Sequence, residues 1–317
     1  MKISKLILSI FVTGCLLAGC QRGGYAVFSG YTQGGTYTVK ADLTGVTVPE
    51  EEIASHIDAI LDSIDFSLSG YNKNSLLTRF NAGVEIVPDR FFSEIRDLSE
   101  RYRTQTGGAF DAASAPLFDI WGFGFTSDSL PDPARVQAAL LACKEEKVLN
   151  FNAIAQGYTC DVVAGYLHSL GVHNMLVDIG EIFCEGLNPS GKGWTIGVDN
   201  PVDGNDTPGQ DLRGIWQSDG RACGIVTSGN YRKFYVKDGR KYAHTIDPRT
   251  GYPVEHDLLS ATVVAPTAAE ADALATACMV IGPDAARALI LGRPELEGYL
   301  ITATGTWTSD GFSLLIP

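Results

Sequence analysis

Residues 267–282 read TAAEADALATACMVIG, and this stretch decides the fold around which the rest of the chain is arranged. Thr267 and Glu270 form a T-x-x-E capping box, which predicts that a helix begins at about Ala268. Gly282 is typical of the residue that follows a helix. Residues 260–265 are apolar and predict a strand, so a strand leads directly into this helix.

The two faces of this predicted helix differ in chemistry. At about 100° per residue, Leu274 and Ile281 share one face, and Asp272 and Thr276 share the opposite face. A carboxylate and a hydroxyl one turn apart are hard oxygen ligands suited to Mg²⁺. The alternative is a solvated helix face. Taken alone, this stretch leaves both interpretations open.

Helical and strand patterns alternate irregularly along the rest of the chain. Helical periodicity predicts helices at residues 53–64, 91–102 and 154–170, and another after Pro133. Strands are expected at residues 31–41, 175–179 and 194–198, with hairpins at 233–246 and 299–312. Residues 107–124 and 200–211 are expected to be loops. Because strict βαβ alternation is missing, the pattern favours an α+β fold.

Composition excludes several classes of protein. The chain has 317 residues, of which 45% are hydrophobic and 19% charged, so it can bury a large core and is not a disordered chain. Its formal net charge of -13 disfavours a broad surface for nucleic acid or anionic lipid. We therefore expect one large domain or two closely joined halves, with no nucleic-acid partner.

The N-terminus carries a targeting pattern. Two lysines precede an apolar run at residues 6–17, and Leu17-Ala18-Gly19-Cys20 resembles the lipobox of bacterial lipoproteins. The run is too short for a membrane span. We expect a signal peptide at residues 1–19, a tether at 20–30 lipidated on Cys20, and a domain at 31–317. The domain would then face the periplasm from a lipid anchor. The alternative is an ordinary secretory signal.

The cysteines and histidines give no clear framework. The five cysteines after residue 30 include no close pair in the sequence, so a disulfide scaffold is not expected. His168 and His173 do not have the spacing of a helical zinc pair. We interpret both as surface or helix-end residues.

Two further segments carry polar groups suited to chemistry. Residues 244–251 (HTIDPRTG) predict a tight turn that presents His244, Asp247 and Arg249 at a strand end, where acid–base or phosphate-binding groups can act. A structural turn is the alternative. Residues 150–158 (NFNAIAQGY) form a polar, small-residue entry to a helix, which lets a ligand approach the backbone. N-capping by Asn150 or Asn152 is the alternative.

Taken together, seven ordered groups of motifs resemble the FAD:protein FMN transferases, the ApbE family. In chain order these groups are QGGTY (33–37), SGY (69–71) followed by Ser75 and Asn81, GAFD (108–111) with WGFG (121–124), IAQGY (154–158) with Asp161, TSGNY (227–231), HTIDPRTG (244–251) and ADALAT (271–276). The resemblance runs from about Tyr31 to the C-terminus.

This resemblance implies an enzyme. Members cleave FAD in a Mg²⁺-dependent reaction, pass FMN through its phosphate to a Thr or Ser hydroxyl of an exported protein, and release AMP. The usual acceptors are flavin-carrying subunits of Na⁺-pumping NADH:quinone oxidoreductase and Rnf-type complexes. The implied fold is a T-fold-related α+β unit with FAD in a cleft between two halves.

The resemblance also implies roles for individual residues. Asp272 and Thr276 would bind Mg²⁺ through side-chain oxygens and Ala153 through its backbone carbonyl. His244 or Asp247 would accept the proton of the acceptor hydroxyl, with His244 preferred because of its ordinary pKa. The residues expected to line the FAD site are Gln33, Tyr71, Trp121, Gly122, Phe123, Asn150, Gln156 and Ile246. For Tyr71, Trp121 and Phe123, the alternative is core packing.

The chain also departs from the family pattern. Gln33 and Gln156 replace residues that are often Met and a charged residue, and Ala275 stands where some members have a second Asp. Gly180 is single where the family usually has Gly-Gly, which affects the backbone beside a strand. Three functions remain open: an FMN transferase, an FAD pyrophosphatase that yields FMN and AMP, and a non-catalytic FAD-binding lipoprotein.

Overall fold

The computed structural model describes residues 24–123, 130–202, 204–205, 207–231, 234–237, 240–243 and 245–316. Among these residues, no helix has both the length and the hydropathy needed to cross a membrane. Cys20 and the expected signal peptide lie outside the described residues, so the anchor stays a prediction.

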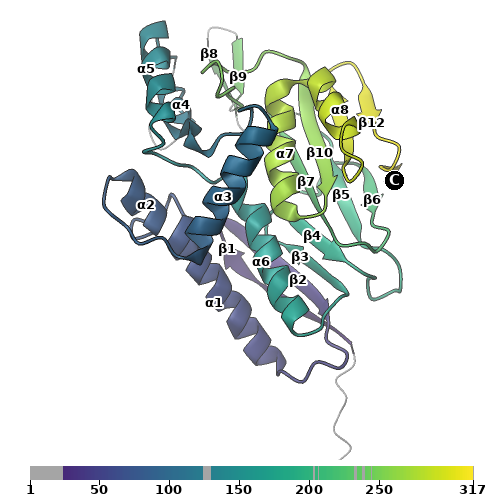
Figure 1. The fold of residues 1–317 in the computed structure, drawn as a ribbon. Coiled ribbons are helices and arrows are strands. Elements are labelled where there is room, and N and C mark those ends of the chain that lie inside the picture. The colour runs from purple at the N-terminus through teal and green to yellow at the C-terminus, as the bar shows by residue number, and fades with distance from the viewer. Residues whose placement is uncertain are drawn as a thin grey trace, which may run out of the picture.

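An eight-stranded sheet forms the centre of the molecule, and each neighbouring pair of its strands is antiparallel (Figure 1). In spatial order its strands are β1 (Tyr25–Thr32), β2 (Gly35–Asp42), β3 (Met175–Asp178), β4 (Ile182–Glu185), β7 (Cys223–Gly229), β10 (Leu258–Ala265), β11 (Glu297–Thr302) and β12 (Thr306–Thr308). A three-stranded sheet contains β5 (Thr195–Asp199), β6 (Leu212–Gln217) and β13 (Leu314–Leu315), and a two-stranded one contains β8 (Phe234–Lys237) and β9 (Arg240–Ala243).

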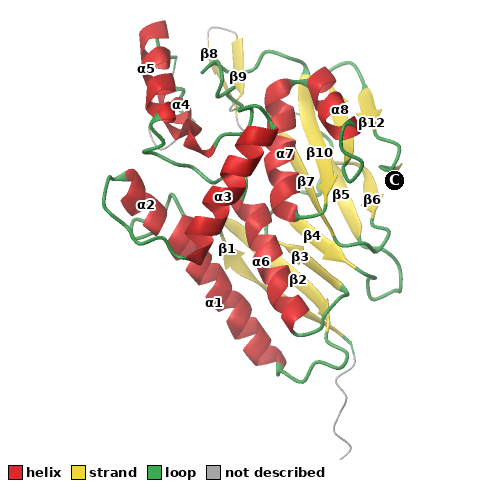
Figure 2. Ribbon diagram, in the orientation of Figure 1, coloured by secondary structure: helices red, strands yellow, loops and turns green. Residues whose placement is uncertain are grey.

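One face of the large sheet is covered by α1 (Glu50–Leu68), α6 (Ala155–Ser169), α7 (Ala268–Ile281) and α8 (Pro283–Leu291) (Figure 2). The remaining elements pack mainly on other helices: α2 (Leu76–Asn81), α3 (Arg90–Gln105), α4 (Ala115–Ile120), α5 (Pro133–Lys144) and a 3₁₀ turn, η1 (Ala112–Ser114). A separate hydrophobic cluster, which includes Trp194, Trp216 and Ile225, joins the small β5–β6 sheet to the large one. The α+β prediction is confirmed.

The first predicted strand proves to be a hairpin. The chain turns at Gln33 and Gly34, whose φ angles of 48° and 83° lie in the left-handed region, so residues 31–41 belong to two strands. The predicted boundary at residue 31 is also wrong, because β1 already begins at Tyr25 and pairs with β2 along its whole length. Apolar side chains of β1, including Phe28, are buried in the core, which explains why this segment is folded and not a tether.

The expected loop at residues 107–124 is wrong for its central part, which forms η1 and α4. Asp111 starts this segment, because its side chain accepts a hydrogen bond from Ala113 N at 2.8 Å. The short elements lack enough turns to show a helical period, so their sequence gave little sign of them. The loop at 200–211 is confirmed, and so are both expected hairpins, as β8–β9 and β11–β12.

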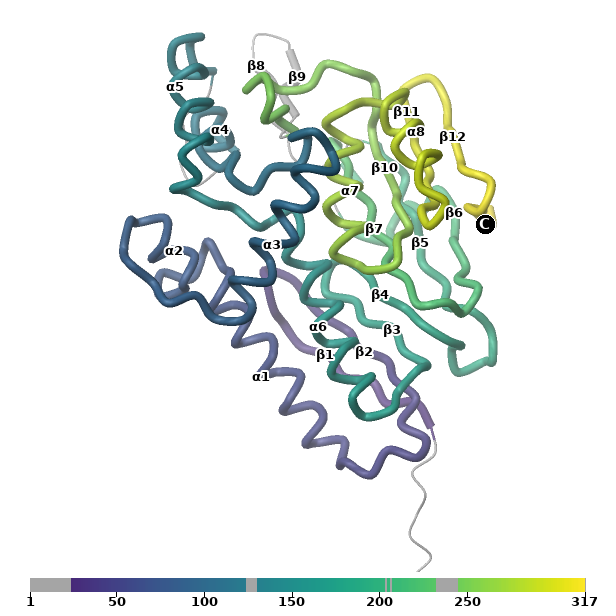
Figure 3. Tube along the Cα trace, in the orientation of Figure 1, coloured from purple at the N-terminus to yellow at the C-terminus, as the bar shows by residue number. Residues whose placement is uncertain are grey.

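Helices α6 and α7 are distant in sequence but lie side by side (Figure 3). Gly157 and Gly224 make this packing possible. A Cβ atom at Gly157 would lie 2.3 Å from Ala268 O, and one at Gly224 would lie 2.3 Å from Ala268 Cα. Only glycine fits at such distances, so the start of α7 is pressed against both α6 and β7.

The alternative interpretation, in which Asp272 and Thr276 lie on a solvated face of α7, does not describe the structure. The predicted helix start at Ala268 is confirmed, and Thr267 caps it by accepting from Glu270 N, whereas the Glu270 carboxylate pairs with Arg293. However, α7 lies against β7 and β10 on one side and against α3 and α6 on the other. Leu274 and Asp272 are therefore both buried, and Thr276 is half-buried. A helix enclosed on most sides has no need of an amphipathic pattern.

The sheet brings two cysteines together that are 39 positions apart in the sequence. Cys184 and Cys223 are register partners on β4 and β7, and their sulfur atoms are 3.9 Å apart. All five described cysteines are buried free thiols.

Candidate functional site

The site is built around Asp272 in the second turn of α7. Its side chain is buried, with the residue 4% exposed, and its Oδ2 accepts a hydrogen bond from Gly157 N at 3.1 Å. Gly157 lies in the first turn of α6, so this bond joins the start of one helix to the carboxylate of the other. In the described part of the chain, no Lys, Arg or His side chain forms an ion pair with Asp272.

Burial dominates the electrostatics of this carboxylate. It raises the pKa of Asp272 from 3.8 to about 7, the Gly157 N–H works in the opposite direction, and the charge of Asp161 raises the pKa further. Asp161 is buried too, and accepts hydrogen bonds from Ala268 N at 2.8 Å and Ala269 N at 2.9 Å. Asp161 therefore caps the start of α7 with two amide donors, whereas Asp272 has a single amide donor. When Asp272 is ionised, the protein compensates its charge poorly.

Ala153 precedes α6, whose N-cap is Ile154. The Gly157 N–H is one of the first-turn amides that have no partner within the helix, and it donates to Asp272. No donor among the described residues bonds to Ala153 O, so this carbonyl oxygen accepts no hydrogen bond. Asn150 does not cap α6 as the alternative interpretation supposed. Its Oδ1 accepts from Asn152 N, and the α6 N-cap is Ile154, without a side-chain bond.

Hydroxyl groups lie one turn further along α7. Thr276 Oγ1 is 3.4 Å from Ser228 Oγ on β7, and Thr227 Oγ1 is 2.8 Å from Thr262 Oγ1 on β10. Ser228 lies within one of the motifs but was not predicted as a site residue. The contact between Ser228 and Thr276 depends on how α7 packs on β7, which a local sequence pattern does not predict.

The oxygen atoms of Asp272, Ala153 and Thr276 suit a divalent cation. Within the described part of the chain, they are a buried carboxylate without a cationic partner, a carbonyl oxygen that accepts no hydrogen bond, and a threonine hydroxyl. All three are hard oxygen ligands, which Mg²⁺ prefers. A cation would also remove the cost of burying the Asp272 charge. Asp272, Thr276 and Ala153 are the residues that would hold it.

Two of the residues predicted to bind FAD, Gln33 in the β1–β2 turn and Gln156 in α6, lie near the first turns of α6. Gln33 Nε2 donates to Thr159 Oγ1 at 2.6 Å, so the β1–β2 turn is held against α6. Gln156 lies over Gly180, where an added Cβ would be 2.5 Å from Gln156 Nε2. Gly180 has a φ of 90°, so both this angle and the close approach require glycine at the position where the family pattern has Gly-Gly.

The aromatic segment at residues 121–123 packs in a hydrophobic cluster. Trp121 is buried in a cluster with Ile246, and its Nε1 donates to Gly251 O at 2.8 Å. Phe123 packs against the same cluster, and Gly122 adopts a φ of 76°. Trp121 and Ile246 are therefore both buried, and their contact with FAD stays a prediction.

Tyr71, in contrast to Trp121, is exposed to solvent. It is 74% exposed in the link between α1 and α2, where its N–H is bonded to Ser69 Oγ at 3.2 Å. A ring this exposed can contact a ligand without loss of core packing.

Asn150, another predicted FAD residue, is positioned by its backbone N–H, which donates to Ala112 O at 2.8 Å.

Asp247 organises a turn. Its Oδ1 accepts from Arg249 N at 2.9 Å, and its carboxylate forms an ion pair with the Arg249 guanidinium at 2.8 Å. This is the structural turn given above as the alternative, and the proton-accepting role of Asp247 stays a prediction. His244 lies outside the described residues.

A cavity of about 410 Å³ lies beside α3 and η1. It is lined by side chains of mixed charge, among them Arg96, Arg103 and Asp111. None of the residues predicted to bind FAD lines it.

The fold and the site define an α+β protein with a buried acidic centre suited to a divalent cation. The family model for ApbE matches residues 34–300. The chain is similar to the FAD:protein FMN transferase of Haemophilus influenzae, with 32% identity over 334 residues that cover 95% of this chain and 94% of that protein. The corresponding protein of Escherichia coli is 30% identical over 98% of this chain and 96% of its own length.

Solved structures agree with these relatives. The apo form of the flavinyl transferase ApbE from Pseudomonas stutzeri has a TM-score of 0.76 and 33% identity, over 90% of this chain and 94% of that one. The flavin transferase ApbE from Vibrio cholerae has a TM-score of 0.76 and 28% identity, over 91% and 98%. The chain belongs to the ApbE family.

Proposed function

We propose that this chain is an FAD:protein FMN transferase that requires Mg²⁺. The observation that carries the proposal is the buried Asp272 carboxylate, which accepts a hydrogen bond from one amide and has no cationic partner among the described residues. The names of its relatives supply the substrate, FAD, and the class of acceptor, a protein.

The proposed reaction exchanges one phosphorus–oxygen bond for another. The oxygen of an acceptor Thr or Ser hydroxyl attacks the FMN phosphorus of FAD, the bond to the AMP oxygen breaks, and AMP leaves. The hydroxyl proton passes to a base, for which His244 is the first candidate and Asp247 the second. Asp247 is the weaker candidate, because its carboxylate is already engaged by Arg249.

The protein would mainly supply position and charge. A bound Mg²⁺ would offset negative charge on the pyrophosphate oxygens. Asp272, Thr276 and Ala153 would hold that ion, and Gln33, Gln156 and Tyr71 would orient the FAD molecule. Trp121 and Ile246 would act through the packing of the segment that carries Gly122.

We also propose where the enzyme works. The Leu-Ala-Gly-Cys sequence supports a lipid anchor on Cys20, with the folded domain facing the periplasm. The acceptors would then be exported flavin-carrying subunits of Na⁺-pumping NADH:quinone oxidoreductase or Rnf-type complexes.

The test uses the purified full-length protein with FAD, Mg²⁺ and a candidate acceptor subunit. A transferase adds the mass of FMN to the acceptor and releases an equal amount of AMP. Free FMN with AMP, and no change in the acceptor, would identify an FAD pyrophosphatase. Tight FAD binding without AMP release would identify a binding protein. An acceptor variant without its Thr or Ser hydroxyl is the control for the site of transfer.

A further inference from the structure

Two histidines and a glutamate meet at the far end of α6. His168 lies in the last turn of α6, His173 in the link between α6 and β3, and Glu185 at the end of β4. Met175 and Glu185 are register partners on β3 and β4, so the antiparallel pairing brings the end of β4 to the link that carries His173. The histidine spacing in sequence does not match a helical pair, because His173 lies beyond the helix.

The three side chains point their ligand atoms at one another. His168 Nε2 is 2.5 Å from Glu185 Oε2, and His173 Nδ1 is 3.1 Å from Glu185 Oε1. All three ligand atoms lie within 4.8 Å of one another. The side chains of His168 and His173 are 36% and 70% exposed, whereas that of Glu185 is 18% exposed. An ion from solution can therefore reach the histidines, and the carboxylate is held in place.

We propose that His168, His173 and Glu185 form a binding site for Zn²⁺ or a similar transition-metal ion. Two imidazole nitrogens and one carboxylate are a ligand set typical of zinc with an open fourth position. Nitrogen ligands also distinguish this cluster from the all-oxygen set around Asp272, which suits Mg²⁺.

Zinc binding would require only a small increase in the distances between the ligand atoms. Bonds of about 2.1 Å in a tetrahedral site place ligand atoms about 3.4 Å apart. The present separations of 2.5 and 3.1 Å are those of hydrogen bonds, so the ion would take the place of the shared protons. Rotation of the exposed His173 ring and a shift of the Glu185 carboxylate provide this change.

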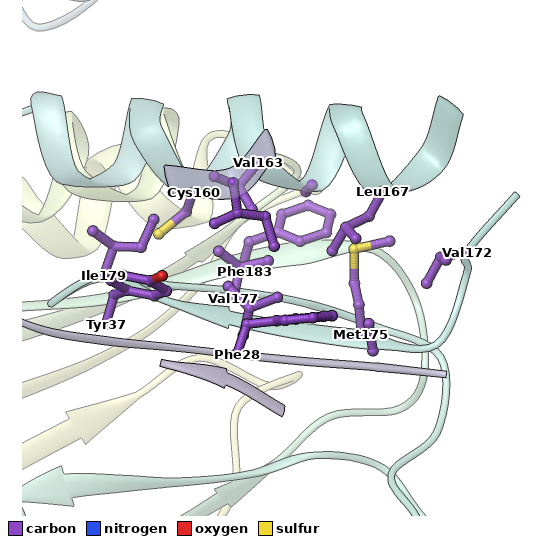
Figure 4. Packing of buried hydrophobic residues seen from close by; sticks show 14 of the residues in the cluster. Phe28, Tyr37, Cys160, Val163, Leu167, Val172, Met175, Val177, Ile179 and Phe183 are labelled. Carbon is purple, nitrogen blue, oxygen red and sulfur yellow. The ribbon is translucent and has the colours of Figure 1, made fainter. Parts of the chain in front are cut away.

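The site is separate from the Asp272 centre. Gly157 and His168 are 11 positions apart on α6, which at about 1.5 Å per residue is about 17 Å along the helix. Figure 4 shows how Cys160 and Leu167 lie at different points along this helix, above the core strands. A bound ion would tie the end of α6 to β4, and would stabilise the folded chain by an amount that rises with the logarithm of the ion concentration above the dissociation constant.

The test is a zinc titration of the metal-free full-length protein, made without a histidine tag. Competition with a coloured chelator should give one zinc ion per chain, and zinc should raise the midpoint of thermal unfolding. His168→Asn, His173→Asn and Glu185→Gln should each weaken zinc binding by about tenfold or more. Replacing Zn²⁺ with Co²⁺ should give visible absorption that the three variants lose.

Two controls decide the interpretation. His56 is an exposed histidine on α1 that stacks on Tyr166 of α6 and is not one of the three proposed ligands. His56→Asn should therefore keep the zinc ion. Asp272→Asn should also keep it. Zinc binding that is absent in the wild type, or that persists in the His168→Asn/His173→Asn double variant, would overturn the proposal. Loss of zinc in Asp272→Asn alone would also overturn it, because the ion would then occupy the other centre. These outcomes do not depend on flavin transfer.

Discussion

The backbone N–H of Gly157 donates to Oδ2 of Asp272 at 3.1 Å, across 115 positions of sequence. Gly157 lies in the first turn of α6, where amides have no partner within the helix, so the bond satisfies this amide and holds the carboxylate. The contact therefore positions one of the three oxygens proposed for the metal. The bond between Gly157 and Asp272 is possible because glycine has no side chain that would hold α7 away from α6.

Asp272→Asn should abolish most flavin transfer while the fold survives. Asparagine keeps the size of the side chain and can still accept from Gly157 N, but it lacks the charge that would hold Mg²⁺. We expect transfer to fall on the order of 100-fold or more, measured by the mass of the acceptor. Asp284→Asn is the matched control, because the Asp284 side chain on α8 is 97% exposed. Normal transfer by Asp272→Asn at limiting Mg²⁺ would reject the metal role.

The stability of the metal-free protein should depend on pH through Asp272. Burial raises its pKa from 3.8 in the unfolded chain to about 7, so the folded state favours the neutral form. The free energy of unfolding should be greatest, as far as this group is concerned, below about pH 4, and should fall as the pH rises through 7. Asp272→Asn should be more stable than the wild type at pH 8, by on the order of 2 to 4 kcal/mol, and similar to it at pH 4.

Urea unfolding of both proteins at several pH values measures this difference. Asp161 is also buried with a raised pKa, so some pH dependence should remain in Asp272→Asn. Mg²⁺ should stabilise the wild type at pH 8 and leave the variant unchanged. Equal pH profiles for the two proteins would contradict the proposed burial of a charged carboxylate.

Gly157→Ala should destabilise the protein, because its Cβ would lie 2.3 Å from Ala268 O. The helices α6 and α7 would have to separate, at a cost of about 1 to 3 kcal/mol in the free energy of unfolding. Gly165→Ala is a matched control on the same helix, since no atom lies within 4 Å of its added Cβ. That change should stabilise the protein by about 0.5 to 1 kcal/mol. The order of the two denaturation midpoints checks the prediction, and a reversed order would refute it.

Tyr71→Ala should weaken FAD binding without changing stability. The ring is 74% exposed, so its removal leaves no cavity, and its loss would remove aromatic contact with the ligand. We expect the dissociation constant for FAD to rise about tenfold in a fluorescence titration. Phe66→Ala on α1 removes another exposed aromatic ring and should keep normal affinity. Equal affinities for the two variants would place the flavin elsewhere.

Cys20→Ala should release the protein from membranes or block its processing, because the proposed lipid is attached to that sulfur. Cys15→Ala tests the other cysteine of the same segment, which Leu-Ala-Gly does not precede, and should leave anchoring unchanged. Membrane fractionation and the mass of the mature N-terminus are the measurements. An unaltered membrane fraction in Cys20→Ala would exclude this anchor.

The sequence by itself determined much of the local structure. Local signals depend on residues within a few positions of one another: the three glutamates in the first turn of α1, the Thr267 cap of α7 and the alternation in β2. Such signals survive in a single sequence because helix caps and side-chain periods are local. The ordered motifs also determined the family, and with it the three oxygens assigned to the metal.

Only the tertiary structure decided what surrounds those residues. The sequence left open whether Asp272 lies on a solvated face; it is buried, because α7 lies between the sheet and two other helices. The sequence left open whether Trp121 packs in a core; its ring is buried in a cluster with Ile246. The meeting of His168 with Glu185, like that of Gly157 with Asp272, depends on how distant segments pair. Packing of this kind is set by the shape of the whole chain, and no window of neighbouring residues contains it.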